Sequence, residues 1–288
     1  MEVLERAHAK INLFLEVLGK RPDGYHELRT IFQSLKLHDT LSFTAREDGR
    51  LVLHCSDPSL PLGPENLVWR AADLLRRYYG ISAGAEVMIE KNIPVAAGLG
   101  GGSSDAAAAL RGFSRLWRLP REGKVLASLA AELGADVPFC LQGGTAVGRG
   151  RGDVLERLPA CPHFYVVLVN PGVAVSTARV YAELKAEELR QGSEYEALRQ
   201  AIVAGDRERI GRLLFNALET VTFRLFPAVA NLKQKVAATG HTLMCGSGAT
   251  LFVLLDDSLE ALKLACDIGE EGLHAWYTET WSGGGANV

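Results

Sequence analysis

A glycine-rich segment over residues 94–105 constrains this chain more than any other feature of its sequence. It reads Pro-Val-Ala-Ala-Gly-Leu-Gly-Gly-Gly-Ser-Ser-Asp, follows a strand-like segment and runs into an alanine-rich stretch with helical spacing. Glycine lets the backbone approach a ligand closely, and the free amides of a first helical turn attract anions. The segment is therefore predicted to join a strand to a helix and to bind phosphate groups at that junction.

A flexible linker is the alternative interpretation of these glycines, but linkers rarely lead directly into Ser-Ser-Asp and a helix. The two best-known phosphate motifs do not fit. The segment lacks the Gly-Lys-Ser/Thr ending of the P-loop, and Ser103 occupies the place of the third glycine of a dinucleotide fingerprint. The sequence thus indicates a third class of nucleotide-binding loop.

The composition limits the partners of such a loop. The chain has 288 residues, of which 48% are hydrophobic and 23% charged, enough for one large core or two ordinary ones. A formal charge of −3 gives no broad basic field for nucleic acid or an anionic membrane. The first ten residues carry several charges, and apolar runs fall well short of the ~20 residues of a membrane-spanning helix. We expect a cytoplasmic protein with no nucleic-acid or membrane partner and with reduced cysteines.

Strands and helices are mixed along the whole chain. Residues 7–17 alternate so that Lys10 and Asn12 share one face of a strand. In the first half we predict further strands of an antiparallel sheet at 41–45, 51–54 and 85–90, and helices at 67–78, 104–117 and 123–133. In the second half we predict strands at 164–169, 251–255 and 275–281, and helices at 194–203, 207–218, 228–238 and 259–268.

Residues 143–153 are rich in glycine and charge, and prolines follow at 159 and 162. We therefore predict a domain boundary here, giving an N-terminal domain of residues 1–158 with the phosphate loop and a C-terminal α+β domain of residues 159–288.

The segment Pro-x-x-x-Gly-Leu-Gly-Gly-Gly-Ser-Ser resembles the phosphate loop of the superfamily of galactokinase, homoserine kinase, mevalonate kinase and phosphomevalonate kinase. Residues 10–13 and 246–250 lie where that superfamily carries its other motifs. Residues 9–15, 21–28 (Arg-Pro-Asp-Gly-Tyr-His-Glu-Leu) and 134–139 (Gly-Ala-Asp-Val-Pro-Phe) are similar to the diphosphocytidyl-methylerythritol kinases. The resemblance implies a two-domain α+β small-molecule kinase fold, with the active site in the cleft between the domains.

The resemblance also implies the reaction, transfer of the γ-phosphoryl group of ATP to the 2-hydroxyl of 4-(cytidine 5'-diphospho)-2-C-methyl-D-erythritol, in the non-mevalonate route to isoprenoid precursors. It assigns Asp136 as the base and Lys10 as the cation that orients it and stabilises charge. Taken singly, an Asp before Val-Pro is more often a turn or cap residue, and a strand Lys is usually solvated. The phosphate loop favours the catalytic interpretation of both.

The resemblance further assigns the two ligands to residues. Tyr25 is expected to stack on the cytosine and His26 to hydrogen-bond its polar edge. Further substrate residues are Asn12, Phe32, Thr177, Tyr181, Gly246, Ser247 and Gly248; the ordinary role of Phe32 and Tyr181 as core aromatics remains open. The ATP residues are Pro94, Gly98, Leu99, Gly100, Gly101, Gly102, Ser103, Ser104 and Asn66. Asn66 equally suits a helix N-cap, and the two roles are compatible.

Magnesium is implied by phosphoryl transfer, with no ligands assigned, because no carboxylate cluster is visible in the sequence. We expect a monomer or weak homodimer acting on a small molecule. Two alternatives stay open: another alcohol kinase of the same superfamily, and a nucleotide-binding module without catalysis. The Pro-Asp-Gly-Tyr-His segment argues against the first, and the presence of both Lys10 and Asp136 argues against the second.

Overall fold

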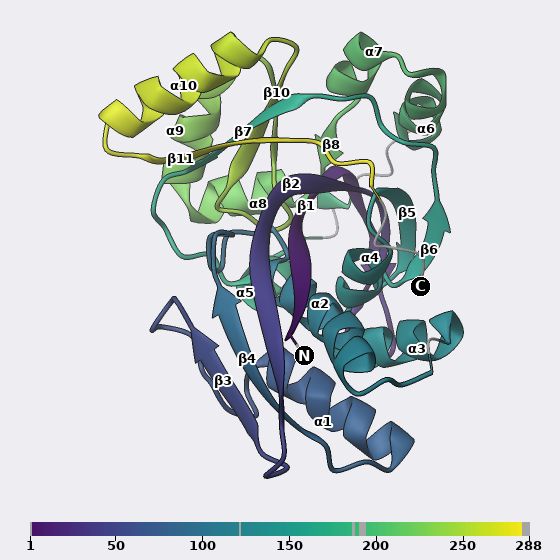
Figure 1. The fold of residues 1–288 in the computed structure, drawn as a ribbon. Helices are drawn as coiled ribbons and strands as arrows, with labels where there is room; N and C mark the ends of the chain where they lie inside the picture. Colours follow the sequence, from purple (N-terminus) through teal and green to yellow (C-terminus); the bar gives the residue numbers. More distant parts are fainter. Residues whose placement is uncertain (1, 121, 186–187, 190–193, 284–288) are drawn as a thin grey trace.

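The computed structural model describes residues 2–120, 122–185, 188–189 and 194–283. Two sheets organise these residues, and helices pack around them (Figure 1). The first sheet runs in the order β3-β4-β2-β1-β8, with β5 on β2 and β6 on β5. Its strands are β1 (Glu2–Lys20), β2 (His26–Arg46), β3 (Leu51–Cys55), β4 (Gly84–Glu90), β5 (Thr145–Gly150), β6 (Val154–Arg157) and β8 (Phe215–Asn216).

The second sheet runs β11-β7-β10-β9 and is antiparallel throughout. Its strands are β7 (Tyr165–Asn170), β9 (His241–Met244), β10 (Leu251–Leu255) and β11 (His274–Glu279). The helices are α1 (Leu67–Tyr79), α2 (Gly101–Leu116), α3 (Gly123–Leu133), α4 (Val137–Gln142), α5 (Thr177–Ala182), α6 (Glu194–Ala204), α7 (Arg207–Arg212), α8 (Leu218–Leu225), α9 (Pro227–Val236) and α10 (Ser258–Glu270).

β1 and β2 form a long antiparallel pair that runs through the middle of the molecule (Figure 1). Residues 9–17 of β1 are all buried, because the strand is covered on both faces. The pairing shifts register between His8 and Lys10 and again between Asn12 and Phe14, as at β-bulges. The polar face predicted for Lys10 and Asn12 is therefore enclosed inside the protein.

Local signals in the sequence explain the helices of the first half. Asn66 accepts a hydrogen bond from the Val68 amide at the start of α1, and Gly80 ends that helix in the left-handed conformation. α3 has the predicted ends, and the amide of Gly134 donates to the carbonyl of Ala130. α2 starts three residues earlier than predicted, inside the glycine-rich segment itself.

Two expectations about secondary structure are wrong. The predicted helix at 207–218 is divided: α7 ends at Arg212, β8 follows, and α8 begins at Leu218. The chain leaves the helix here because β8 pairs in parallel with β1. The sheet of the first half is also not purely antiparallel, since β3 and β4 pair in parallel. α1 lies between them in the sequence, and such a crossover returns the chain in the same direction.

The two halves share a hydrophobic core. Ile11, Leu13 and Phe14 of β1 belong to one buried cluster with Val166 of β7 and Phe252 of β10. The glycine-rich stretch near the expected boundary forms β5 in the first sheet. The boundary itself, between residues 158 and 159, falls between β6 and β7 and stays a prediction.

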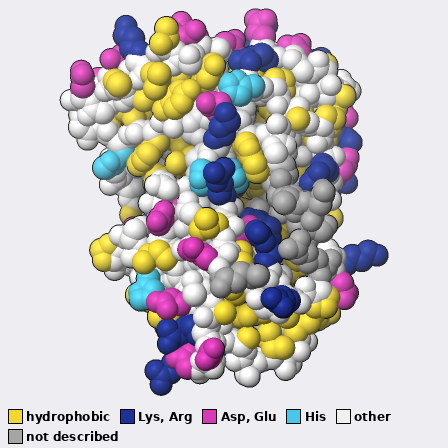
Figure 2. Space-filling view, viewed as in Figure 1, with side chains coloured by type: hydrophobic (Ala, Val, Ile, Leu, Met, Phe, Trp, Pro, Cys, Tyr) yellow, Lys and Arg dark blue, Asp and Glu magenta, His cyan; other side chains and the backbone are white. Residues whose placement is uncertain are grey.

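In the part of the chain that the structure describes, no helix is long and apolar enough to cross a membrane. Positive and negative side chains are interspersed over the face drawn in Figure 2. This distribution agrees with the small net charge of the chain, and neither positive nor negative charge dominates that face.

Candidate active site

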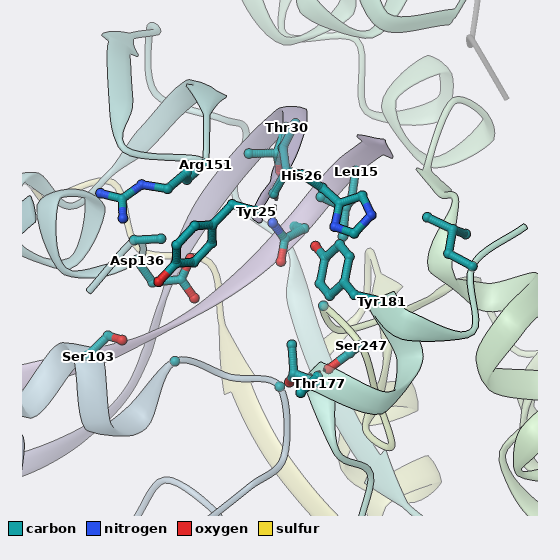
Figure 3. Close-up of a pocket in the computed structure, with 18 of the residues that line it drawn as sticks. Leu15, Tyr25, His26, Thr30, Ser103, Asp136, Arg151, Thr177, Tyr181 and Ser247 are labelled. Atoms are coloured by element: carbon teal, nitrogen blue, oxygen red, sulfur yellow. Dashed lines mark hydrogen bonds between the residues drawn. The ribbon is translucent and has the colours of Figure 1, made fainter. Parts of the chain in front are cut away.

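A pocket of about 840 Å³ is lined by residues from both halves of the chain. The first half contributes β1, β2 and the turn between them, the glycine-rich loop, the start of α4 and the residue after β5. The second half contributes α5 and the turn between β9 and β10. Figure 3 shows Ser103 and Asp136 on one side, and Tyr181, Thr177 and Ser247 on the other. The predicted cleft site is thus confirmed as a pocket formed by both halves.

Lys10 and Asp136 meet in this pocket. The Lys10 ammonium lies 3.1 Å from the Asp136 carboxylate and donates to the side-chain oxygen of Asn12 at 3.1 Å. The Lys10 side chain is 6% exposed and that of Asp136 is 32% exposed. Lys10 also lies over the ring of Phe32, 5.4 Å from its centroid. The lysine is therefore fixed by three neighbours, whereas the carboxylate still faces the open pocket.

Asn12 is itself oriented. Its side-chain amide donates to the Thr30 hydroxyl at 2.8 Å, and that hydroxyl donates to the Phe14 carbonyl at 2.6 Å. The chain of hydrogen bonds turns the Asn12 oxygen toward Lys10. A fixed oxygen on one side and a carboxylate on the other hold the ammonium in one place.

The glycine-rich loop lies directly against Lys10. The backbone amide of Lys10 donates to the Leu99 carbonyl at 3.0 Å. Gly100 has a φ of 71°, and a Cβ there would lie 2.9 Å from Cγ of Lys10. Gly98 has a φ of 76°, and a Cβ there would lie 2.3 Å from the Cys245 carbonyl oxygen. Both positions require glycine, for conformation and for space.

The two loop serines have different surroundings. Ser103 lines the pocket, whereas Ser104 is buried and its hydroxyl donates to the His8 carbonyl at 2.6 Å. Ser104 thus ties α2 to β1. Of the predicted ATP residues, those that line the pocket are Gly98, Gly100 and Ser103; those outside its lining are Pro94, Leu99, Gly101, Gly102, Ser104 and Asn66.

Asn66 has the N-cap role that its sequence position suggested. Its oxygen accepts from the Val68 amide at 2.9 Å, and its amide nitrogen donates to the Pro61 carbonyl at 2.8 Å. Both ends of the side chain are therefore engaged within the protein, and its contact with adenine stays a prediction.

A tight turn presents Tyr25 to the pocket. The Arg21 amide donates to the Tyr25 carbonyl at 2.8 Å, and Gly24 adopts a φ of 87°. The Asp23 carboxylate accepts from the Tyr25 amide at 3.1 Å. The Tyr25 side chain is half exposed, and the guanidinium of Arg151 lies 5.0 Å from its ring centroid (Figure 3). One face of the ring is supported by a cation, as in a stacking platform.

His26 and Tyr181 stack on each other with ring centroids 5.0 Å apart. Burial, followed by the charge of Lys20, lowers the pKa of His26, so its imidazole is neutral at pH 7 and offers both a donor and an acceptor. Burial also raises the pKa of the Tyr181 hydroxyl. On the same wall, the hydroxyls of Thr177 and Ser247 lie 2.8 Å apart.

The structure brings most predicted substrate residues together. Those that line the pocket are Asn12, Tyr25, His26, Phe32, Thr177, Tyr181, Gly246 and Ser247; Gly248 does not. Phe32 also stacks on Phe139, at 4.7 Å between centroids, so it serves the core as well as the pocket. Phe32 therefore both packs in the core and lines the pocket.

Sequence reasoning missed three polar residues that line the pocket, Lys20, Thr30 and Arg151. Thr30 lies opposite Leu15 in the β1–β2 pairing, and that register is visible only in the structure. Arg151 lies in the stretch interpreted as a boundary, and only the pairing of β5 with β2 brings it near Tyr25.

Among the described residues, no group of three or more His, Cys, Asp or Glu side chains is placed to hold a metal ion. Mg²⁺ in phosphoryl-transfer sites takes few protein ligands and keeps waters and phosphate oxygens. The pocket oxygens of Ser103 and Asp136 fit such a sparse ligand set.

Comparison with known proteins agrees with this geometry. Residues 66–144 match the GHMP kinases N terminal domain, and residues 198–272 match the GHMP kinases C terminal domain. A homoserine kinase from Cytophaga hutchinsonii shares the fold, with a TM-score of 0.76 at 19% identity over 98% of this chain and 95% of that one. The chain belongs to the GHMP kinase family, as its phosphate loop predicted.

The similarity is more specific than the superfamily. A 4-diphosphocytidyl-2-C-methyl-D-erythritol kinase from Pelotomaculum thermopropionicum is 49% identical, over 92% of this chain and 93% of its own. The enzyme of that name from Enterococcus faecalis is 44% identical, over 92% and 94%. A crystal structure of 4-(cytidine 5'-diphospho)-2C-methyl-D-erythritol kinase superposes with a TM-score of 0.82 at 37% identity, covering 98% of this chain and 100% of that one. Within the GHMP kinases, the chain therefore belongs to the family of these kinases.

Proposed function

We propose that this chain transfers the γ-phosphoryl group of ATP to the 2-hydroxyl of 4-(cytidine 5'-diphospho)-2-C-methyl-D-erythritol. The observation that carries the proposal is the contact between Lys10 and Asp136, 3.1 Å apart, beside the glycine-rich loop. Phosphoryl transfer needs positioning, charge stabilisation and an acceptor for the alcohol proton, and this arrangement can supply all three.

Asp136 is the group that takes the proton. As the substrate oxygen attacks the γ-phosphorus, its O–H proton passes to the Asp136 carboxylate, the new O–P bond forms and the bond to the β-phosphate oxygen breaks, releasing ADP. Lys10 orients the carboxylate and stabilises the negative charge of the transferred group. Asn12 keeps Lys10 in place through its 3.1 Å hydrogen bond.

The phosphates of ATP are proposed to lie along the glycine-rich loop, against its pocket-lining residues Gly98, Gly100 and Ser103. The start of α2 adds its positive dipole end there. Mg²⁺ is proposed to arrive with ATP and to be held by the Ser103 hydroxyl, with Asp136 within the same pocket. When bound, it neutralises charge on the phosphate oxygens.

The acceptor is proposed to lie at the opposite end of the pocket, with its cytosine on Tyr25 and its polar edge against His26. Arg151 and Lys20 add two positive charges to this end of the lining, which suits a diphosphate. The protein is proposed to act as a monomer or weak homodimer in the cytoplasm.

The test is an acceptor panel in which ADP release is coupled to a spectroscopic readout. We expect turnover of the cytidylylated substrate and none of mevalonate, homoserine or galactose, because a site that hydrogen-bonds a polar group rejects ligands lacking it by on the order of 10⁴-fold. Methylerythritol phosphate without the cytidine should also be a poor acceptor. Tyr25→Ala should weaken binding of the substrate by about 1–3 kcal/mol, the range of base–aromatic stacking, and leave ATP binding unchanged.

Equal turnover of an acceptor that lacks cytidine would refute the proposed substrate and leave the alternative of another alcohol kinase. ATP binding without turnover of any acceptor would support the remaining alternative, a nucleotide-binding module.

A further inference from the structure

A buried ion cluster lies behind the glycine-rich loop, outside the residues that line the pocket. It consists of Asp39 on β2, Lys91 just after β4 and Asp105 in the second turn of α2. The Lys91 ammonium contacts Asp39 and lies 2.7 Å from the Asp105 carboxylate. The side chains of Asp39, Lys91 and Asp105 are 0%, 6% and 7% exposed, respectively. Charges so deeply buried are costly, and nothing in the proposed chemistry uses these three directly.

The cluster joins the two ends of the glycine-rich loop. Lys91 and Asp105 are fourteen positions apart and flank the whole glycine-rich segment. At the entry side, one oxygen of Asp39 accepts from the amides of Asn92 and Ile93 at 2.6 and 2.8 Å. Entry and exit are thus fixed to the same lysine, one through Asp39 and the other through Asp105.

The cluster also lies beside Gly101, which follows the pocket-lining Gly100. A Cβ on Gly101, the first residue of α2, would lie 3.5 Å from the Lys91 ammonium and 3.2 Å from Cγ2 of Ile93. The first turn of α2 therefore lies directly on Lys91. A shift of the Lys91–Asp105 contact would move the amides that point toward the proposed phosphates.

We propose that Asp105, held by Lys91, is a positioning residue that fixes the phosphate loop in its ATP-binding conformation before ATP arrives. This inference rests on the proposed binding of ATP phosphates by the loop. Ordering a glycine-rich loop costs conformational entropy, and a loop that is already fixed avoids that cost upon binding.

The pKa of Asp105 reflects its burial beside Lys91 and Asp39. Burial raises the pKa of its carboxyl to about 7, while the charge of Lys91 lowers it and that of Asp39 raises it. Lys91 thus opposes the effect of burial. One oxygen, Oδ1, is buried and accepts no hydrogen bond from any described residue.

The decisive variant is Asp105→Ala. It removes the contact between Asp105 and Lys91 yet leaves Lys91 paired with Asp39, so that no buried charge loses its last partner. A loop released from Lys91 must be ordered again when ATP binds, at a cost in conformational entropy, so we expect ATP to bind at least about tenfold more weakly. At saturating ATP, kcat should stay within about threefold, because bound ATP then holds the loop in its binding conformation. Without ATP, amide exchange over residues 95–102 should accelerate, and ATP should suppress it.

Two variants control for a purely structural role. Asp105→Asn should restore ATP binding to near the parent value, because its oxygen can still accept from Lys91 and its amide can donate toward Asp39. Arg111→Met breaks an ion pair of similar burial on the same helix, in which Arg111 Nε lies 2.9 Å from Glu5 and the side chains are 12% and 10% exposed. It should lower the melting temperature without changing ATP affinity.

The proposal fails if folded Asp105→Ala binds ATP within twofold of the parent, or if Arg111→Met weakens ATP binding as much. ATP binding is measured by titration with no acceptor present. A parent that binds ATP but phosphorylates no acceptor would refute the proposed function and leave this test intact.

Discussion

The proposed role of the Asp136 carboxylate depends on the neighbour that it contacts, Lys10. Lys10 is nearly buried, and its ammonium has an oxygen partner on each side, Asn12 and Asp136. An ammonium fixed in this way cannot reorient, so its positive charge acts on one point of the pocket. The carboxylate remains reachable from the pocket, as a base that accepts a proton from a bound alcohol must be.

Asp136→Asn tests this role directly. The amide keeps the size of the side chain and can still accept from Lys10, but it cannot take a proton. We expect kcat to fall by at least about 10²-fold, the low end for loss of a general base. ATP affinity, measured by titration, should stay near the parent value. Turnover close to the parent rate in the folded variant would remove Asp136 from the proton transfer.

At the scale of elements, the glycine-rich loop works because it rests on β1. Gly100→Ala places a Cβ 2.9 Å from Cγ of Lys10, a side chain that cannot move away without leaving Asn12 and Asp136. We expect kcat to fall about tenfold as Lys10 is displaced. The positive φ should also cost about 1 kcal/mol of stability.

Gly272→Ala separates these two effects. Gly272 has a φ of 77°, close to that of Gly100, but a Cβ there would meet nothing within 4 Å. Its variant should lose similar stability, by the midpoint of thermal unfolding, and keep the parent kcat. An equal loss of kcat in both variants would show that backbone strain, rather than the contact with Lys10, is responsible.

Elements with local signals are predictable from the sequence. α1 has its Asn66 cap and Gly80 terminator, and α3 ends where Gly134 follows, so the predicted bounds of both helices lie close to the observed ones. The division of 207–218 has no local signal, because β8 forms only by pairing with β1, about 200 residues away. Pairing between segments far apart in the sequence overrides local helical spacing when it supplies hydrogen-bond partners to a buried strand.

The same distinction applies to the site. Lys10, Asp136 and the loop stand in compact motifs, so the sequence alone singles them out as candidates, and the structure brings them to one pocket. Arg151 and Lys20 escape such reasoning, because they lie outside those motifs and their places depend on how the strands pair. The Asp39–Lys91–Asp105 cluster escapes it for a related reason, since Asp39 lies about 50 residues before Lys91 in the sequence and only the folded sheet brings them together.

On the scale of the whole molecule, the pocket depends on both halves holding one relative position. Thr177, Tyr181 and Ser247 come from the second half, and Lys10 and Asp136 from the first. The shared core around Ile11 and Phe252 keeps these walls at a fixed separation. A buried apolar cluster that crosses the predicted boundary makes independent motion of the halves costly.

This shared core predicts that the chain unfolds in one cooperative step. Trp117 packs on the core of the first half and Trp276 on the cluster that joins the halves. Two variants, each retaining one of these tryptophans with the others replaced by Phe, report on the two regions by fluorescence. We expect their urea midpoints to coincide and ATP to shift both equally, as in a two-state transition. Separate midpoints would show that the segments on either side of residue 158 are independent folding units, which would strengthen the boundary and contradict a shared core.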